Sequence, residues 1–134
     1  MTSQIKVTIS GSYHKHLDRI LAAKKQFEDL GVLVLRPHTD EVMQTEGPVV
    51  RLKGDAAEPG LVQAAQLEAI DASNLVYVVN PGGYIGASAT LEIGWARRGG
   101  ITVITAEPAF EEVLFAVVQA VGTPEAALRF LEEK

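Results

Sequence analysis

Short apolar runs alternate along the chain with longer segments in which apolar residues recur every three or four positions. From Ile5 to Ile9 apolar residues take every second place, which predicts a strand that ends at the turn 10–12. From Tyr13 to Leu30 the apolar spacing is helical, and Gly31 is a typical residue for a helix end. Three further apolar runs each predict a strand, namely 32–35, 75–79 and 101–105. The run 75–79 has no polar residue except a tyrosine hydroxyl, as expected for a strand buried on both faces.

Helical spacing returns between and after these strands. It predicts helices over 61–70 and from Ala87 to the pair Gly99-Gly100, with Trp95 in the core. The clearest stripe runs from Phe110 to Val121, and Thr123-Pro124 reads as an N-cap and first helical position before a last helix over 125–132. The segment 38–60 is polar and broken by glycine and proline, except around 49–52, and a loop of this length is usually functional or mobile.

Strands that alternate with helices predict a single α/β domain over 1–134, with a parallel sheet of four to five strands and helices on both faces. The expected strand order is the flavodoxin-like, Rossmann-like 2-1-3-4-5, whose switch point lies between the first and third strands. Ligands of such sheets bind there, outside the carboxyl ends of the strands. We therefore expect the loops 10–13 and 80–88 to meet at one crevice.

Composition narrows the classes of function. The formal charge of -5 comes from 17 acidic and 12 basic residues without a run of Lys or Arg, which argues against a nucleic-acid polymer as partner. The absence of cysteine excludes thiolate metal sites and cysteine nucleophiles. No run approaches membrane-spanning length and no signal-like segment opens the chain, so we expect a cytoplasmic protein without a membrane partner. His14 and His16 fall on different helix faces, and neither metal nor cofactor is expected.

The glycine-rich segment 80–88 carries the candidate chemistry. Its glycines allow a ligand to approach the backbone, Ser88 is expected to cap the next helix, and free amide groups at that helix start favour an anion. Glu92 lies about one turn further in, where the helix dipole favours its ionised form. Two interpretations stand: a surface acid that complements the dipole, or a carboxylate nucleophile that faces the crevice.

The other candidates are also open to two interpretations. Ser10 and Ser12 contact a phosphate or ribose, or only form the turn; Tyr13 binds a ligand, or packs at the helix start; Tyr84 closes over the crevice, or covers the glycine turn. His38 acts at the crevice edge, or has a local structural role. The full predicted binding set is Ser10, Gly11, Ser12, Tyr13, Asn80, Gly83, Tyr84, Gly86 and Ser88.

Three stretches resemble the nucleoside 2-deoxyribosyltransferase-like superfamily: 70–80 (IDASNLVYVVN), 83–88 (GYIGAS) and 91–96 (LEIGWA). The resemblance implies that Glu92, in a Glu-x-Gly-x-Ala motif, attacks the anomeric carbon of a deoxynucleoside, after which water or a second base resolves the glycosyl ester. This chemistry parallels that of a retaining glycosidase and needs no metal. It also implies a homo-oligomer, because relatives complete their sites across a subunit contact. The apolar segment 110–121 then supplies the interface, or else it covers the sheet.

The chain departs from the family pattern at Gln66, which takes the place of an acid in the helix before the third strand, and at Asn74. Glutamine cannot supply a proton. Two hypotheses follow. The first is an enzyme that cleaves or transfers the N-glycosidic bond of a nucleoside or its 5′-monophosphate, with an acid from the long loop (Asp40, Glu41, Glu46 or Asp55). The second is a nucleotide-binding or sensing module without catalysis.

Overall fold

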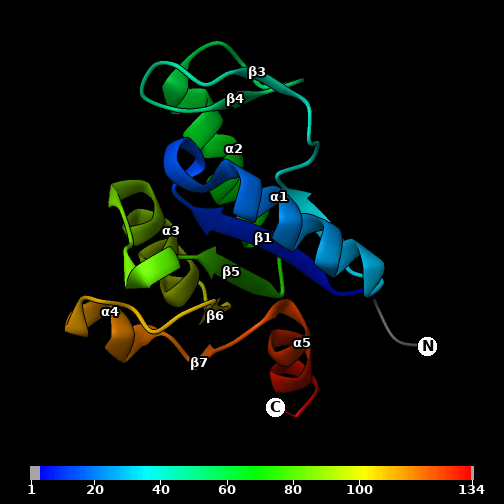
Figure 1. Cartoon of the computed structure of the whole chain (residues 1–134), viewed down its shortest axis with the longest axis vertical. Coiled ribbons are helices and arrows are strands. Elements are labelled where there is room, and N and C mark those ends of the chain that lie inside the picture. The colour runs from blue at the N-terminus through cyan, green and yellow to red at the C-terminus, as the bar shows by residue number, and fades with distance from the viewer. Residues whose placement is uncertain (1–3, 134) are drawn as a thin grey trace.

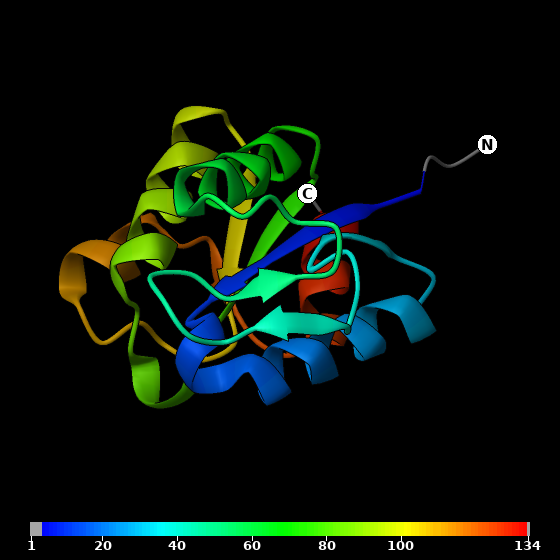
Figure 2. The same ribbon diagram turned by 90° about the horizontal axis from the view of Figure 1, so that it is seen from above.

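In the computed structural model, which describes residues 4–133, five parallel strands form one sheet with helices on both faces (Figures 1 and 2). The strands lie in the order β2 (Leu33–Arg36), β1 (Lys6–Gly11), β5 (Leu75–Val79), β6 (Thr102–Thr105) and β7 (Ala120–Val121). All four pairings are parallel. The strands β3 and β4 form a separate hairpin. When only the five strands of the main sheet are numbered along the chain, their order is the predicted 2-1-3-4-5.

The sequence of β5 explains the layers. All five of its residues are buried; Leu75, Tyr77 and Val79 pack into the core on one face, and Val76 and Val78 into the core on the other. Helices α1 (Tyr13–Asp29) and α5 (Pro124–Glu132) lie on the first face, and α2 (Pro59–Asp71) and α3 (Ala87–Arg98) on the second, as Figure 2 shows. Thr123 caps α5 as expected, because its side chain accepts from the Ala126 amide.

The predicted helix over 110–121 is wrong in its extent. The helix α4 spans only Glu112–Val117, and the chain then turns into β7, the fifth strand. Gln119 explains the change: its backbone N–H donates to the Val103 carbonyl at 2.9 Å, and its side-chain oxygen accepts from the Val103 amide at 2.7 Å. The segment after Val117 therefore pairs with the open edge of β6, although the apolar spacing in the sequence remains helical as far as Val121. No residue of α4 is buried, so this helix does not cover the sheet.

Trp95 is a second correction, because it is 44% exposed rather than part of the core. Its indole N–H donates to the Asp71 carboxylate at 2.8 Å, and so joins α3 to the end of α2. An indole has an apolar body and one N–H that needs a partner, and the exposed end of a neighbouring helix supplies that partner here.

The segment between β2 and α2 is partly ordered as an antiparallel hairpin of β3 (Val42–Gln44) and β4 (Arg51–Leu52). In Figure 1 it lies beyond one end of the sheet, beside the start of α1 and the helix α2. Val50 and Leu52 are buried, and they anchor the hairpin. Among the helices of residues 4–133, none combines the length and apolarity needed to cross a membrane.

Candidate functional site

A cavity opens beyond the carboxyl ends of β1 and β5, at the predicted switch point. Its walls come from four places: the end of β1 with the start of α1, one face of α2, the start of α3 with the preceding loop, and the segment after β2. The lining residues are Gly11, Ser12, Tyr13, His14, Arg36, Pro48, Val49, Val50, Val62, Gln63, Gln66, Tyr84, Gly86, Ala87, Ser88, Ala89 and Glu92. The structure thus brings most of the predicted site residues together.

Gly11 shapes the floor of this cavity. It has a φ of 141°, and a Cβ atom at this position would lie 2.6 Å from the Val79 carbonyl oxygen. That oxygen is backbone of the neighbouring strand and cannot move aside alone. A residue without a side chain is therefore required for β1 to stay paired with β5 as far as its last residue.

Glu92 is the buried acid of the site. It is only 4% exposed, and its carboxylate accepts three hydrogen bonds, from Ser10 Oγ at 2.6 Å, Gln63 Nε2 at 2.9 Å and Gln66 Nε2 at 3.4 Å. Burial raises the pKa of Glu92, and these three donors with the nearby Arg36 charge offset only part of that rise. The helix dipole was expected to favour the ionised form of Glu92, and burial acts against that form.

Ser10 and Ser12 have distinct places. Ser10 is fully buried and donates to Glu92, so it supports the carboxylate from beneath instead of lining the cavity. Ser12 lines the cavity and is the N-cap of α1, where its hydroxyl accepts from the Lys15 amide at 3.2 Å. Ser88 also lines the cavity, but Gly86 is the N-cap of α3, so the predicted cap at Ser88 is wrong.

The two tyrosines frame the opening. Tyr13 turns its hydroxyl inward to donate to the Ile9 carbonyl at 2.9 Å, and burial together with the Glu92 charge raises the pKa of this phenol. Tyr84 is 43% exposed, and the Lys15 ammonium lies 4.1 Å from the centre of its ring. His14 lines the cavity and donates to the Gly47 carbonyl at 2.9 Å, which ties the start of α1 to the hairpin segment.

Asn80 and Gly83 lie outside the cavity. The Asn80 side chain exchanges two hydrogen bonds with the backbone of Glu107, at 2.8 and 2.9 Å. Gly83, which has a φ of 88°, packs against the Pro108 carbonyl, 2.7 Å from where a Cβ would stand. Both residues join the loop after β5 to the loop after β6, and the structure does not bring them to the ligand site.

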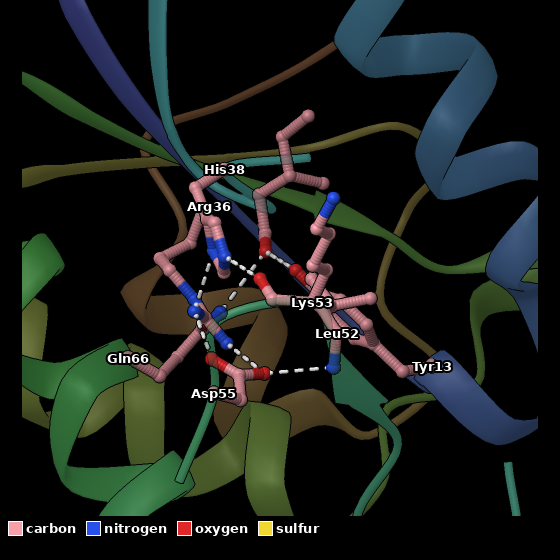
Figure 3. Close-up of polar contacts among 8 residues, drawn as sticks. Tyr13, Arg36, His38, Leu52, Lys53, Asp55 and Gln66 are labelled. Atoms are coloured by element: carbon pink, nitrogen blue, oxygen red, sulfur yellow. Dashed lines mark hydrogen bonds and ion pairs between the residues drawn. The ribbon is translucent and has the colours of Figure 1, made fainter. Parts of the chain in front are cut away.

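The loop acids separate into two groups. Asp40, Glu41 and Glu46 are exposed and do not line the cavity. Asp55 is turned inward, and it forms an ion pair with Arg36 in which Arg36 Nη1 and Asp55 Oδ1 are 2.7 Å apart (Figure 3). His38 belongs to the same group of contacts, so its structural interpretation fits the geometry.

Sequence reasoning missed Gln63 and Arg36 as site residues. Gln63 lies three positions before Gln66, so helical spacing places both amides on one face of α2, and this signal was available. Arg36 ends β2 at the carboxyl edge of the sheet, where its position pointed to the crevice. The apolar wall of Val49 and Val50 carried no signal, because it depends on the fold of the hairpin.

The arrangement provides a carboxylate in a partly apolar cavity, with the starts of α1 and α3 at its edge. Such helix starts present N–H groups that favour an anion. Within residues 4–133 no group of three or more His, Cys, Asp or Glu side chains is placed to hold a metal ion.

Comparisons with known proteins bear on the fold. No protein-family model matches the chain, and no curated protein matches its sequence. Among solved structures, a conserved protein from Enterococcus faecalis has a TM-score of 0.65 and 18% identity, over 98% of this chain and 99% of that one. BcmB, a CMP N-glycosidase from Clostridium botulinum, has a TM-score of 0.57 and 16% identity, over 95% and 97%. The chain shares the fold of these two proteins over the parts that they cover.

Proposed function

We propose that the protein cleaves or transfers the N-glycosidic bond of a nucleoside or deoxynucleoside, or of its 5′-monophosphate, with Glu92 as the nucleophile. The observation that carries this proposal is the Glu92 carboxylate, buried at the cavity with three donors on its two oxygens. Support comes from the resemblance around Glu92 and from the CMP N-glycosidase that shares the fold.

In the proposed reaction a Glu92 oxygen bonds to the anomeric carbon while the bond from that carbon to the base breaks, and its electron pair leaves with the base. A water or a second base then attacks the same carbon, gives up a proton and releases the Glu92 carboxylate, and this proton balances the one that the departed base takes up. Ser10, Gln63 and Gln66 hold the carboxylate in place for attack, because each donates a hydrogen bond to one of its oxygens. The apolar side of the cavity, formed by Val49 and Val50, suits a base or sugar ring.

A 5′-phosphate would bind at the two helix starts. Ser12 and His14 at the start of α1, with Ala87 and Ser88 at the start of α3, line the same cavity. The first backbone N–H groups of a helix have no partner within the helix and so favour an anion, and Lys15 lies over the ring of Tyr84, which lines the cavity. These groups favour a monophosphate over an uncharged nucleoside.

A second candidate is a nucleotide-binding or sensing module without catalysis. Gln66 favours it, because this buried amide occupies the place in which the resemblance implies an acid, and Asp55 is held by Arg36.

We also propose that the chain forms a homo-oligomer through the exposed apolar segment around α4, and that it works in the cytoplasm.

Release of free base separates the two candidates. We expect base to appear when the protein is incubated with deoxynucleosides and nucleosides or, faster, with their 5′-monophosphates, and we expect Glu92→Ala to abolish it. Glu68→Ala is the matched control, because it removes an exposed carboxylate from the same pair of helices. Binding without release by the wild type would favour the non-catalytic module, and equal release by Glu92→Ala would overturn the proposal that Glu92 is the nucleophile.

A further inference from the structure

Arg36 and Asp55 form a buried ion pair next to the cavity. Their side chains are 9% and 4% exposed, and the contact is bidentate, with Arg36 Nη1 and Nη2 donating to the two Asp55 oxygens at 2.7 and 3.2 Å (Figure 3). Burial alone would raise the pKa of Asp55, but the bonds from Arg36 and the Leu52 amide outweigh it, and the pKa lies below its ordinary value. The pair is therefore charged, although burying two charges is costly.

The donors of Arg36 fix the orientation of Gln66. An arginine side chain can only donate, and Arg36 Nε lies 3.2 Å from Gln66 Oε1. The amide must therefore present its oxygen to Arg36 and its NH₂ group to the other side, where it donates to the Ile9 carbonyl at 3.1 Å and to Glu92 at 3.4 Å. The opposite orientation would set the Gln66 oxygen against the Glu92 carboxylate, with no proton between two acceptors.

The segment that covers the cavity holds Arg36 in place. Besides Asp55 it supplies His38, whose Nε2 donates to the Lys53 carbonyl at 2.7 Å, so that its Nδ1 accepts from Arg36 Nη1 at 2.8 Å. The same segment provides the apolar wall of the cavity at Val49 and Val50. The same conformation of the segment between β2 and α2 therefore both forms the apolar wall of the cavity and holds the Arg36 guanidinium in place.

We propose that Arg36 and Asp55 are positioning residues, which act through Gln66 to set the direction and the donors of the Glu92 carboxylate. The ordered chain runs from Asp55 to Arg36, to Gln66 and then to Glu92, and each link is a hydrogen bond. The inference deepens the proposed function and rests on it for its catalytic consequence. The ordering of Glu92 itself is a property of the protein without substrate.

The first test measures Glu92 directly. The midpoint at which its carboxyl carbon titrates is followed by ¹³C NMR, with the signal assigned by its loss in Glu92→Gln. In the double variant Arg36→Met/Asp55→Leu the midpoint should move to higher pH, because Gln66 is free to turn and the guanidinium is gone. The double variant is chosen because apolar replacement of a whole buried pair is often tolerated, whereas a single change leaves an uncompensated charge.

A conservative variant separates position from charge. Arg36→Lys keeps a positive charge but cannot hold Gln66 and Asp55 at once in the geometry of a planar fork. We expect its midpoint to move as well, and the exposed pair variant Glu41→Gln/Lys53→Gln, from the same segment, to leave it unchanged. A wild-type midpoint in folded Arg36→Lys would overturn the positioning role, and a shift in the double variant alone would then be the effect of the lost charge.

The second test uses the rate of base release. In Arg36→Lys we expect kcat to fall by about 10- to 100-fold with little change in KM, because the carboxylate is misplaced while the other residues that line the cavity remain. The acid limb of the rate profile should move with the NMR midpoint. If the wild type releases no base, the proposed function fails, yet the titration still decides whether Arg36 positions Glu92.

Discussion

At the scale of single residues, the site is a balance around one carboxylate. Glu92 is buried in a place that opposes its charge, and three neutral donors compensate only in part. A serine hydroxyl and a glutamine amide can donate whatever the pH, whereas an acid can donate only while it is protonated. Gln66 in particular gives Glu92 a hydrogen bond without adding a second negative charge beside it. A glutamine at this position cannot supply a proton, but unlike an ionised acid it does not repel the Glu92 carboxylate.

This balance has a consequence for stability. The pKa of Glu92 lies above its ordinary value of 4.5 in the folded chain, so below that pH both the folded and unfolded states are protonated. As pH rises, the unfolded state ionises first, and the wild type loses stability until the folded pKa is passed. Because a glutamine side chain does not titrate, Glu92→Gln should gain stability relative to the wild type across that window, by about 1.4 kcal/mol for each pH unit of elevation.

Urea unfolding of the two proteins from about pH 4 to about pH 8 measures this difference, because that range runs from the ordinary carboxyl pKa to neutral pH. Other groups titrate equally in both proteins and cancel. A difference that stays flat with pH, or that falls, would show that the folded chain does not disfavour the ionised carboxylate. The catalytic proposal would then lose its account of how activity depends on pH.

Residue patterns found part of the site and missed the rest for physical reasons. Gly11 and Tyr13 were predicted because they follow a strand whose carboxyl end must meet that of its neighbour in a parallel sheet, whereas Glu92 was predicted from its place near a helix start and from the family resemblance. Asn80 follows β5 as well, but its amide is used up by the Glu107 backbone. The link from Arg36 to Asp55 joins residues 19 positions apart across an irregular segment, and no spacing rule encodes such a contact.

At the scale of elements, the apolar spacing of a segment predicts its structure only where no unpaired strand edge lies close enough to bind it. The strands β1, β2, β5 and β6 and the helices α1, α2 and α3 follow the apolar pattern, since each has a partner layer on the predicted side. The segment 110–121 has the clearest helical pattern, yet Ala120–Val121 joins the sheet because the edge of β6 offers unpaired backbone groups. The hairpin was not predicted, because β3 and β4 are only three and two residues long and their register is irregular.

Pairing of β1 with β5 at the cavity floor gives a prediction at this scale. Gly11→Ala forces a Cβ against the Val79 carbonyl, so we expect the carboxyl end of β1 to separate from β5 and the free energy of unfolding to fall by about 3 kcal/mol. Gly31→Ala is the matched control: its φ is also positive, at 84°, but no atom lies within 4 Å of its Cβ. It should lose only about 1 kcal/mol, from backbone strain.

Chemical denaturation of both variants gives the comparison, and hydrogen exchange of the β1 and β5 amides locates the damage. The exchange should accelerate at the ends near Gly11 and Val79 in Gly11→Ala alone. Equal losses of stability in the two variants would mean that strain, and not the close approach of the strands, makes glycine necessary at the cavity floor.

At the scale of the whole molecule, the two most exposed large apolar side chains among residues 4–133 lie together in or beside α4. Phe110 and Val113 are each 78% exposed and Phe115 is 53% exposed, all in or beside α4. Exposed apolar side chains gathered in this way mark a contact surface more often than a free one. Its place also matters, because the Phe110 amide donates to the Gly83 carbonyl at 2.8 Å, directly before Tyr84 of the cavity. A partner bound to this edge would stand next to the ligand.

We therefore expect the protein to self-associate through α4. Val113→Glu places a charge in the middle of the apolar edge and should raise the dissociation constant of the oligomer by about tenfold or more, while the monomer stays folded because Val113 contacts no core. Leu33→Glu is the control: it adds the same charge at a 40% exposed apolar residue on β2, the opposite edge of the sheet. Sedimentation over a range of concentrations, run with base release on the same samples, measures both effects.

If the wild type sediments as a monomer at every concentration, or if Leu33→Glu dissociates it equally, α4 is not the contact. If Val113→Glu dissociates the oligomer and base release falls with it, the second copy completes the site at the Tyr84 side of the cavity.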